Sequence, residues 1–294
     1  MRTNFTIEKK NEITILQNKI QNMSFKNKTV FISGGTRGIG HAIGIRLAKE
    51  GANIVIAAKS TEENPKLGGT IYTAAEDMTN AGGKGLGIKC DIRNEEEVAA
   101  AVKQTVDTFG GIDILINNAS AINLSPIAQL EMKRYDLMQD INTRGTFLCS
   151  KMCLPYLLKS ENPQILMLAP PLTSITERWF AGHTGYSIAK FGMSLVVLGL
   201  GGEYKGKVGV NALWPRTTIA TAAVVNLLGG ETVANSSRKP EIMADAAYYI
   251  LKRDAKTSTG NFFMDDEVLI SEGITDLEQY AVKPGVELTP DFFV

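Results

Sequence analysis

The sequence predicts a doubly wound α/β fold in which one seven-stranded parallel sheet is covered by helices on both faces. From Lys28 onward, short runs rich in β-branched residues alternate with longer stretches of helical period, which is the pattern of such a sheet. The first run leads directly into a glycine-rich turn and an amphipathic helix, as in a Rossmann-type fold. No repeat or low-complexity linker interrupts residues 28–265, so we expect a single domain there.

Apolar runs predict the strands of the sheet, and they are Thr29–Ser33, Asn53–Ala57, Gly85–Lys89, Ile112–Asn117, Gln164–Leu168, Lys207–Leu213 and Asn261–Met264. Stretches of helical period separate them, and these begin near Gly38, Thr70, Asn94, Lys133, Thr184, Thr218 and Pro240. Asn94 followed by Glu97 resembles a capping box, which predicts a helix start at this point.

Two flanks lie outside this domain. Residues 1–27 form an N-terminal extension with weak periodicity, to which we assign no function. Residues 266–294 form a C-terminal tail that contains Pro284 and Pro290 and has an aromatic end, Phe292–Phe293. Such a tail is too short for a core of its own, so we expect it to pack on the domain or on a neighbouring subunit.

The charge balance excludes one class of partner. The 294 residues include 31 Lys or Arg and 31 Asp or Glu, so the chain has no overall field that attracts nucleic acid or an anionic membrane. No local basic patch is present either, and we expect no nucleic-acid partner. The apolar fraction of 44% and the charged fraction of 21% exclude a disordered chain.

Cysteine usage and the termini bear on location. Cys90, Cys149 and Cys153 form no CxxC pair and no even disulfide framework, which fits free thiols in a reducing cytosol. The chain has only two His residues, so no ligand set completes a metal site around these thiols. The N-terminus has no apolar signal region, and we find no apolar stretch near the ~18 residues of a membrane span. We expect a cytoplasmic protein without a membrane span.

The glycine-rich turn predicts a phosphate site. After Ser33, the residues with this expected role are Gly34, Thr36, Arg37, Gly38, Ile39 and Gly40. Glycines let the backbone approach a bound phosphate, and amides at the start of the following helix hold a pyrophosphate. The spacing is G-x-x-x-G-x-G rather than G-x-G-x-x-G, and a turn without a ligand is the alternative.

Further motifs follow this loop in a fixed order. They are Asp91-Ile92, Asn117-Asn118-Ala119, Asn142, Tyr186-Ser187-Ile188-Ala189-Lys190 and Asn211-Ala212-Leu213-Trp214-Pro215. With the loop, they make the chain resemble the short-chain dehydrogenase/reductase family over the whole domain. Stretches such as Pro65–Ala75 and Pro290–Phe293 resemble its hydroxysteroid dehydrogenase-like branch. Longer members of that branch append a sterol-carrier domain, so the resemblance implies that this chain holds only the dehydrogenase part.

The resemblance also implies a nicotinamide cofactor and an assembly. Beyond the glycine-rich loop, the residues expected to contact the cofactor are Lys59, Asp91, Ile92, Asn118, Ala119, Tyr186, Lys190, Pro215 and Thr218. Family members usually pair through the helices that here hold Asn142 and Tyr186, so we expect a homodimer or homotetramer.

Tyr186 and Lys190 are the expected catalytic pair. They are four residues apart and therefore neighbours on one helix face. A free phenol has a pKa of about 10, and a nearby ammonium favours the phenolate, so the pair makes a general acid/base nearer neutral pH. By the resemblance, Tyr186 exchanges a proton with the substrate oxygen and Lys190 lowers its pKa and holds the nicotinamide ribose. The resemblance also implies that Asn142 anchors a water for proton relay. A solvent-exposed pair on a surface helix is the alternative.

One departure from the family concerns the end of the fifth strand. The family usually has two serines there, whereas this chain has Ala169 and Pro170, which carry no hydroxyl to polarise a substrate carbonyl. Thr173 and Ser174 lie thirteen and twelve residues before Tyr186, close to the family's spacing. One of them supplies the missing donor in one interpretation; both are ordinary polar loop residues in the other.

Cofactor choice follows from the end of the second strand. Dehydrogenases that select NAD commonly have an acidic residue here, but this chain has Ala58 followed by Lys59. Arg37 adds a second cation on the same side. The sequence therefore predicts NADP(H) over NAD(H).

These features predict an oxidoreductase that transfers a hydride between NADP(H) and a carbonyl or secondary alcohol. Trp179, Phe180 and Trp214 flank the expected cleft, which favours a hydrophobic, lipid-like substrate unless they serve only the core. The missing serine keeps open a nucleotide-binding scaffold with lost or very weak catalysis. Enoyl reduction would normally place Tyr and Lys farther apart than here.

Overall fold

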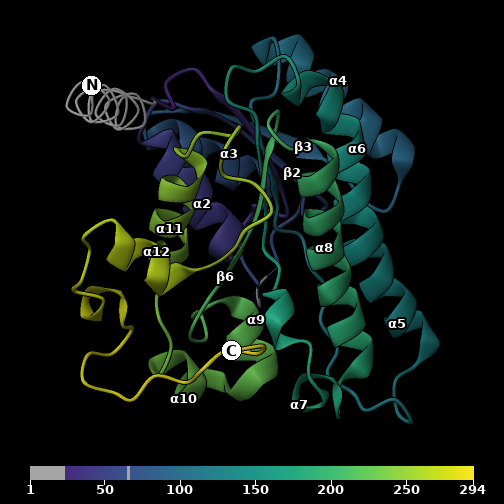
Figure 1. Ribbon diagram of the computed structural model, residues 1–294, viewed down its shortest axis with the longest axis vertical. Coiled ribbons are helices and arrows are strands. Elements are labelled where there is room, and N and C mark those ends of the chain that lie inside the picture. Colours follow the sequence, from purple (N-terminus) through teal and green to yellow (C-terminus); the bar gives the residue numbers. More distant parts are fainter. Residues whose placement is uncertain (1–23, 65–66) are drawn as a thin grey trace, which may run out of the picture.

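The computed structural model describes residues 24–64 and 67–294, and a single parallel sheet of seven strands runs through its centre (Figure 1). The strand order is β3-β2-β1-β4-β5-β6-β7, so the direction of winding reverses between β1 and β4. The strands are β1 Thr29–Ser33, β2 Asn53–Ala58, β3 Lys84–Lys89, β4 Ile114–Asn117, β5 Gln164–Met167, β6 Gly209–Trp214 and β7 Phe262–Met264. The predicted doubly wound fold is confirmed, and each strand lies within two residues of its expected bounds. Of the predicted extension 1–27, residues 1–23 lie outside the described residues.

Helices cover both faces of the sheet. One face packs against α2 (Gly38–Ala48), α3 (Ile71–Asn80) and α11 (Glu241–Leu251). The other packs against α4 (Glu95–Phe109), α6 (Thr146–Leu157) and α8 (Thr184–Glu203), as the two flanks of Figure 1 show. Successive residues of a strand point to opposite faces, which is why Val30 and Ile32 belong to the first core and Phe31 to the second. All five residues of β1 are buried, as expected for a central parallel strand.

Shorter elements connect these layers. They are α5 Met132–Met138, the π-helical turn η1 Gln139–Gly145, η2 Leu172–Ser174, α7 Glu177–Phe180, α9 Ala222–Val224, η3 Val225–Gly229, α10 Gly230–Asn235, α12 Asp265–Ser271 and η4 Glu278–Tyr280. Helix α12 crosses the expected boundary between residues 265 and 266. The aromatic end of the tail packs back onto the domain, where Phe293 is completely buried.

The start of α4 differs in one detail from the expected capping box. The Asn94 side chain accepts a hydrogen bond from the Glu97 amide (3.0 Å), as predicted. The Glu97 carboxylate, however, accepts from the amide of Asp91 (2.8 Å) instead of from that of Asn94. The second bond of a capping box, from the Asn94 amide to the Glu97 side chain, is therefore replaced by a bond that ties α4 to the turn after β3.

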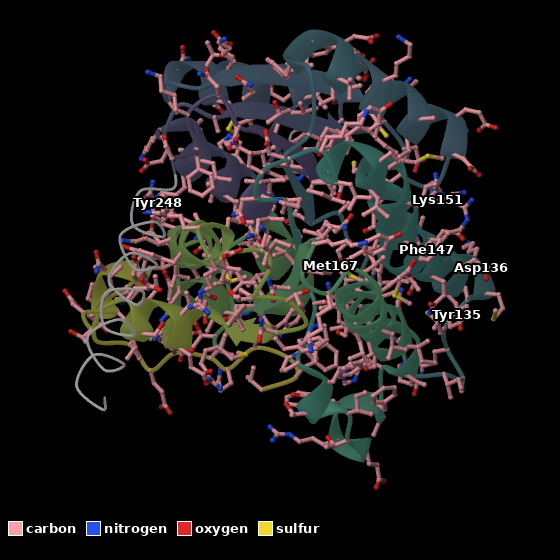
Figure 2. All side chains as sticks on the ribbon, turned by 45° about the horizontal axis from the view of Figure 1, so that its top comes forward. Tyr135, Asp136, Phe147, Lys151, Met167 and Tyr248 are labelled. Atoms are coloured by element: carbon pink, nitrogen blue, oxygen red, sulfur yellow. The ribbon has the colours of Figure 1, made fainter. Side chains whose placement is uncertain are left out.

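Helix α8 has a membrane-like composition that the sequence prediction did not single out. Its 20 residues have a mean hydropathy of 1.2, enough by length and composition to cross a membrane. However, 56% of this stretch is buried within the protein, because α8 packs between α6 and the sheet. The buried half is that of a core helix, whereas Leu195 and Leu198 are exposed. Figure 2 shows the contrast across this layer, with Met167 of β5 in the interior and Phe147 and Lys151 of α6 on the outside.

Candidate active site

A cavity of about 590 Å³ opens at the carboxyl ends of the central strands, where the winding of the sheet reverses. This is the place where open α/β sheets bind ligands, and the volume is that of a small-molecule site. The predicted residues that line it are Gly34, Thr36, Arg37, Gly38, Ile39, Lys59, Asp91, Ile92, Asn118, Ala119, Tyr186, Lys190 and Pro215. The glycine-rich loop and the Tyr–Lys pair therefore face the same space, although about 150 residues separate them in the chain.

The glycine-rich loop is held against the end of β4. Gly34 has a left-handed φ of +71°, and a Cβ there would lie 2.9 Å from the Cα of Ala119. A Cβ on Gly40 would lie 2.5 Å from the Nδ2 atom of Asn118. Asn118 uses that nitrogen to donate to the carbonyl oxygens of Ser33 (3.1 Å) and Gly34 (2.8 Å). Gly40 is thus a packing residue behind the loop and does not line the cavity.

The start of α2 fits a bound phosphate. Gly38 begins the helix with a left-handed φ of +59°. No side chain caps this end, and the first turn has no acidic residue. The first amides of a helix lack partners within the helix and carry its positive dipole end, so they suit an anion. The residues present therefore fit the pyrophosphate of a dinucleotide.

At the far end of the cavity, cations surround one carboxylate. The Arg93 guanidinium donates to both carboxylate oxygens of Asp91, and Lys59 lies 3.6 Å from the same group. These interactions, chiefly the hydrogen bonds from Arg93, lower the pKa of Asp91 to about 2. Arg37 donates to the carbonyl oxygen of Gly68 (2.6 Å). Ala58 ends β2, so no carboxylate stands where NAD-selective sites commonly have one.

The Tyr–Lys pair lies on the first turns of α8, and both side chains are buried, Tyr186 with 7% and Lys190 with 3% exposure. The Lys190 ammonium donates to the carbonyl oxygen of Leu168 (2.6 Å) and lies 4.9 Å from the centroid of the Trp214 ring. Burial lowers the pKa of Lys190 to about 7. Burial also raises the pKa of Tyr186 well above its usual value. The shift is opposite to the expected lowering of this phenol's pKa, because desolvation dominates and the charge of Asp291 acts in the same direction.

Asn142 lies in the π-helical turn η1, a distortion frequent at functional sites. Its side chain is completely buried and pairs twice with Ala121: Oδ1 accepts from the amide (2.7 Å) and Nδ2 donates to the carbonyl oxygen (2.9 Å). Asn142 therefore joins η1 to the loop after β4, and its side chain does not line the cavity.

Three other candidates lie away from the cavity. Thr173 is exposed on η2. The Ser174 hydroxyl donates to the carbonyl oxygen of Phe293 (2.5 Å), so it is engaged by the C-terminal tail. Thr218 pairs its hydroxyl with Ser237 (2.7 Å) and its amide with the carbonyl oxygen of Thr289. Ala169 and Pro170 are buried at the end of β5, and neither side chain carries a hydroxyl.

The C-terminal tail contributes to this site, which no pattern in the sequence indicated. Asp291 and Phe292 line the cavity beside Tyr186 and Lys190. The neighbouring Phe293 is completely buried with its ring centroid 6.1 Å from that of Tyr186. The aromatic end of the chain signalled packing, but nothing in its spacing indicated where it packs. Of the predicted aromatic residues, Trp214 lines the cavity, Trp179 packs on Phe292 and Phe293, and Phe180 stacks on Phe191.

Known proteins resemble this chain in sequence and structure. The family model for short chain dehydrogenases matches residues 28–228. Hydroxysteroid dehydrogenase-like protein 2 of Xenopus laevis is 56% identical over 266 residues, which are 90% of this chain. The chain spans 63% of the length of that relative.

Two crystal structures also superpose closely. One, of a protein from Xanthomonas campestris, is 55% identical with a TM-score of 0.89, covering 92% of this chain and 99% of that one. The other, of a short chain dehydrogenase homologue from Mycobacterium thermoresistibile, is 50% identical with a TM-score of 0.87, covering 92% and 96%. With the cavity and its loop, these similarities show that the chain belongs to the short-chain dehydrogenase/reductase family of nicotinamide-dependent oxidoreductases.

Proposed function

We propose that this protein is an NADP(H)-dependent oxidoreductase that interconverts a carbonyl and a secondary alcohol on a hydrophobic, lipid-like substrate. One observation carries the proposal: the glycine-rich loop and the buried pair Tyr186 and Lys190 line one cavity. A phosphate-binding loop and a general acid/base in a single space are what hydride transfer to a carbonyl requires. Residues 28–265 would form the catalytic unit, with 266–294 packed on it.

The residues of the cavity divide into two roles. Gly34, Thr36, Gly38 and Ile39 would bind the pyrophosphate, and the residues expected at the rest of the cofactor are Arg37, Lys59, Asp91, Ile92, Asn118, Ala119 and Pro215. The nicotinamide, when bound, donates or accepts the hydride. Tyr186 would give its phenolic proton to the oxygen of a carbonyl substrate, or take one from an alcohol. Lys190, when charged, favours the phenolate that this exchange leaves.

Two positive residues support the preference for NADP(H). Lys59 and Arg37 both line the cavity close to the end of β2, where Ala58 leaves room for a 2′-phosphate. A carboxylate in that place would repel the phosphate and bind the ribose hydroxyls of NAD instead. The protein would therefore use NADP(H) better than NAD(H).

The lining near Tyr186 supports a hydrophobic substrate. Ile122, Leu168, Trp214 and Phe292 present apolar side chains there. Burial of apolar substrate surface against them contributes about 25 cal/mol per Å². A ketone or secondary alcohol on a hydrophobic framework would suit this end of the cavity.

A second function is favoured by the missing hydroxyl. The buried Ala169 and Pro170 offer no donor to the oxygen that gains negative charge during reduction. Loss of one such donor typically costs about 2.7–4 kcal/mol, or 10²–10³ in rate. A nucleotide-binding scaffold with weak or lost catalysis would have this site.

One experiment separates the two functions. NADPH oxidation is followed with a panel of hydrophobic ketones, and cofactor binding is measured by fluorescence on the same protein. Tight NADPH binding with turnover that falls in Tyr186→Phe supports the enzyme. Tight binding without turnover of any ketone or secondary alcohol supports the scaffold.

The assembly would be a homodimer or homotetramer formed through α6 and α8. Phe147 of α6, labelled in Figure 2, is 57% exposed, and Leu195 and Leu198 of α8 are 56% and 54% exposed. Exposed apolar groups gathered on two neighbouring helices favour a partner surface. Light scattering that gives the 31.9 kDa monomer at micromolar concentration would contradict this assembly. The three buried thiols fit a cytoplasmic location.

A further inference from the structure

The end of the chain closes the cavity by tying two loops together. Its residues 289–294 cross from the segment after β6 to η2, the turn after β5. The hydrogen bonds are Thr218 N to Thr289 O (2.9 Å), Asp291 N to Arg216 O (3.2 Å), Trp214 Nε1 to Phe292 O (2.6 Å) and Ser174 Oγ to Phe293 O (2.5 Å). This segment is therefore a built part of the site.

Phe293 fixes the position of the segment. Its φ of +68° is in the left-handed region, which is uncommon for a residue with a bulky side chain. Its buried ring packs against Phe191 (5.1 Å between centroids), Trp214 (5.8 Å) and Tyr186. Such a conformation is strained and persists only where the surroundings hold it. Two residues before this anchor, the Asp291 carboxyl lines the cavity.

Lys190 lines the same cavity as Asp291, and Trp214 links the two: its ring lies 4.9 Å from the Lys190 ammonium, and its Nε1 donates to the carbonyl oxygen of Phe292, the residue after Asp291. The ammonium has two neutral partners, the carbonyl oxygen of Leu168 and the sulfur of Met193 (3.4 Å). A buried cation without a negative charge nearby is costly and tends to lose its proton. A neutral amine would no longer favour the phenolate of Tyr186, so the chemistry needs a compensating charge here.

We propose that Asp291 is a positioning residue of the active site, which the C-terminal segment places so that its negative charge keeps Lys190 protonated beside Tyr186. The inference rests on the proposed roles of Tyr186 and Lys190. Asp291 acts through Lys190 and takes no part in the transfer of hydride or proton.

The electrostatics of the cavity agree with this arrangement. Burial lowers the pKa of Lys190 to about 7, and the charge of Asp291 opposes that shift. Burial raises the pKa of Asp291 to about 7, and the charge of Lys190 opposes that shift in turn. The two groups therefore titrate as a coupled pair.

Other charged groups bear on the pair. Asp265 of α12 raises the pKa of Asp291, and Asp291 raises that of Tyr186 on α8. The Arg216 guanidinium next to the segment pairs with Asp266 and Glu267, so it is turned toward α12. The remaining charged groups of the cavity lie at its cofactor end, and they are Arg37, Lys59 and Asp91.

The test measures the pKa of Lys190 directly. In the full chain with ¹³C- and ¹⁵N-labelled lysine, the Lys190 signal is assigned with Lys190→Arg and titrated by NMR, with and without NADP⁺. Asp291→Asn should lower this pKa by about one unit, since an opposite charge nearby shifts a pKa by about that much or more. Glu287→Gln is the matched control, because it removes the same charge from an exposed position two residues before this segment. It should leave the pKa unchanged.

A second pair of measurements covers the case in which Asp291→Asn loosens the segment. The fluorescence of Trp179 and Trp214, which both contact Phe292, reports whether the segment stays in place. Lys190→Met leaves the Asp291 carboxyl in the segment and removes the cation instead. Linkage then requires the pKa of Asp291 to rise by as much as the pKa of Lys190 falls in Asp291→Asn. Unchanged pKa values for Lys190 in Asp291→Asn and for Asp291 in Lys190→Met would overturn the proposal.

Turnover adds a readout that a purely structural role would not move. If Lys190 must be charged, kcat/KM falls as the pH rises through its pKa. Asp291→Asn should shift this limb to lower pH by about one unit, and Asp291→Glu should restore it. An NMR shift without any turnover would support the charge pair and refute the proposed enzyme, whereas turnover with an unmoved limb would refute the role of Asp291 alone.

Discussion

The two ends of the cavity are built differently. At the proposed cofactor end, the groups available for binding are backbone groups and short-range motifs: a glycine-rich loop, the uncapped start of α2 and Asn118, which fastens the loop to the end of β4. At the proposed substrate end, side chains come from α8, β6, the residue after β5 and the end of the chain, and Phe293 packs against Tyr186 and Trp214. A site formed by backbone groups can therefore be predicted from one contiguous stretch of sequence. A site formed by side chains depends on which distant segments pack together.

The largest expected effect lies at the substrate end. Tyr186→Phe keeps the ring and removes the proton, so kcat should fall by roughly 10²–10⁴ while NADP(H) still binds. Stopped-flow or steady-state assays of NADPH oxidation measure kcat, and cofactor titrations on the same sample measure NADP(H) binding. Tyr72→Phe, at a 61% exposed tyrosine outside the cavity, is the control. Near-normal kcat in Tyr186→Phe would end the assignment of Tyr186 as acid/base.

The anchor of the C-terminal segment should have the next largest effect. Phe293→Ala removes a fully buried ring, which typically costs about 3–5 kcal/mol, and alanine keeps a Cβ at the left-handed φ of +68°, so no backbone strain is relieved in return. Urea denaturation measures the change in the free energy of unfolding. Ile127→Ala, at a 78% exposed position, should change it by less than about 0.5 kcal/mol. A loss as small as in the control would mean that the segment is dispensable for stability.

At the cofactor end, reversal of two charges tests selectivity. Arg37→Glu combined with Lys59→Glu should weaken NADPH binding by about tenfold to a hundredfold, because a carboxylate repels the 2′-phosphate. Fluorescence titration at fixed ionic strength measures this change against NADH. Lys84→Glu makes the same kind of change at the opposite end of the neighbouring strand β3 and should have little effect. Equal loss for NADPH and NADH would refute the preference for NADP(H).

The smallest effect concerns η2. Ser174→Ala removes the hydrogen bond to Phe293 and should cost about 1 kcal/mol of stability, whereas Thr173→Ala, on the exposed side, should cost less than about 0.5 kcal/mol. Assays of kcat/KM on both variants test whether either hydroxyl also serves the substrate. A drop below about threefold in both would show that neither replaces the family's serine.

The parallel sheet and the glycine-rich loop could be predicted from the sequence alone. Strand β1 has its predicted bounds, and the alternation of strands and helices predicted the parallel sheet, because periods of 2 and 3.6 residues are local properties of the chain. The loop from Gly34 to Ile39 was predicted for the same reason, since one strand, one turn and one helix hold it together.

Only the tertiary structure determines which side chains meet at the substrate end and how they are buried. The sequence placed Tyr186 and Lys190 on one helix face, but their pKa shifts come from burial by segments far away in the chain. It named Thr173 and Ser174 by spacing, but only packing turned Ser174 toward Phe293. It marked the aromatic tail as apolar, but only the fold placed Asp291 in the same cavity as Lys190. The physical reason is that desolvation and Coulomb interactions act through space, and sequence patterns report only neighbours along the chain.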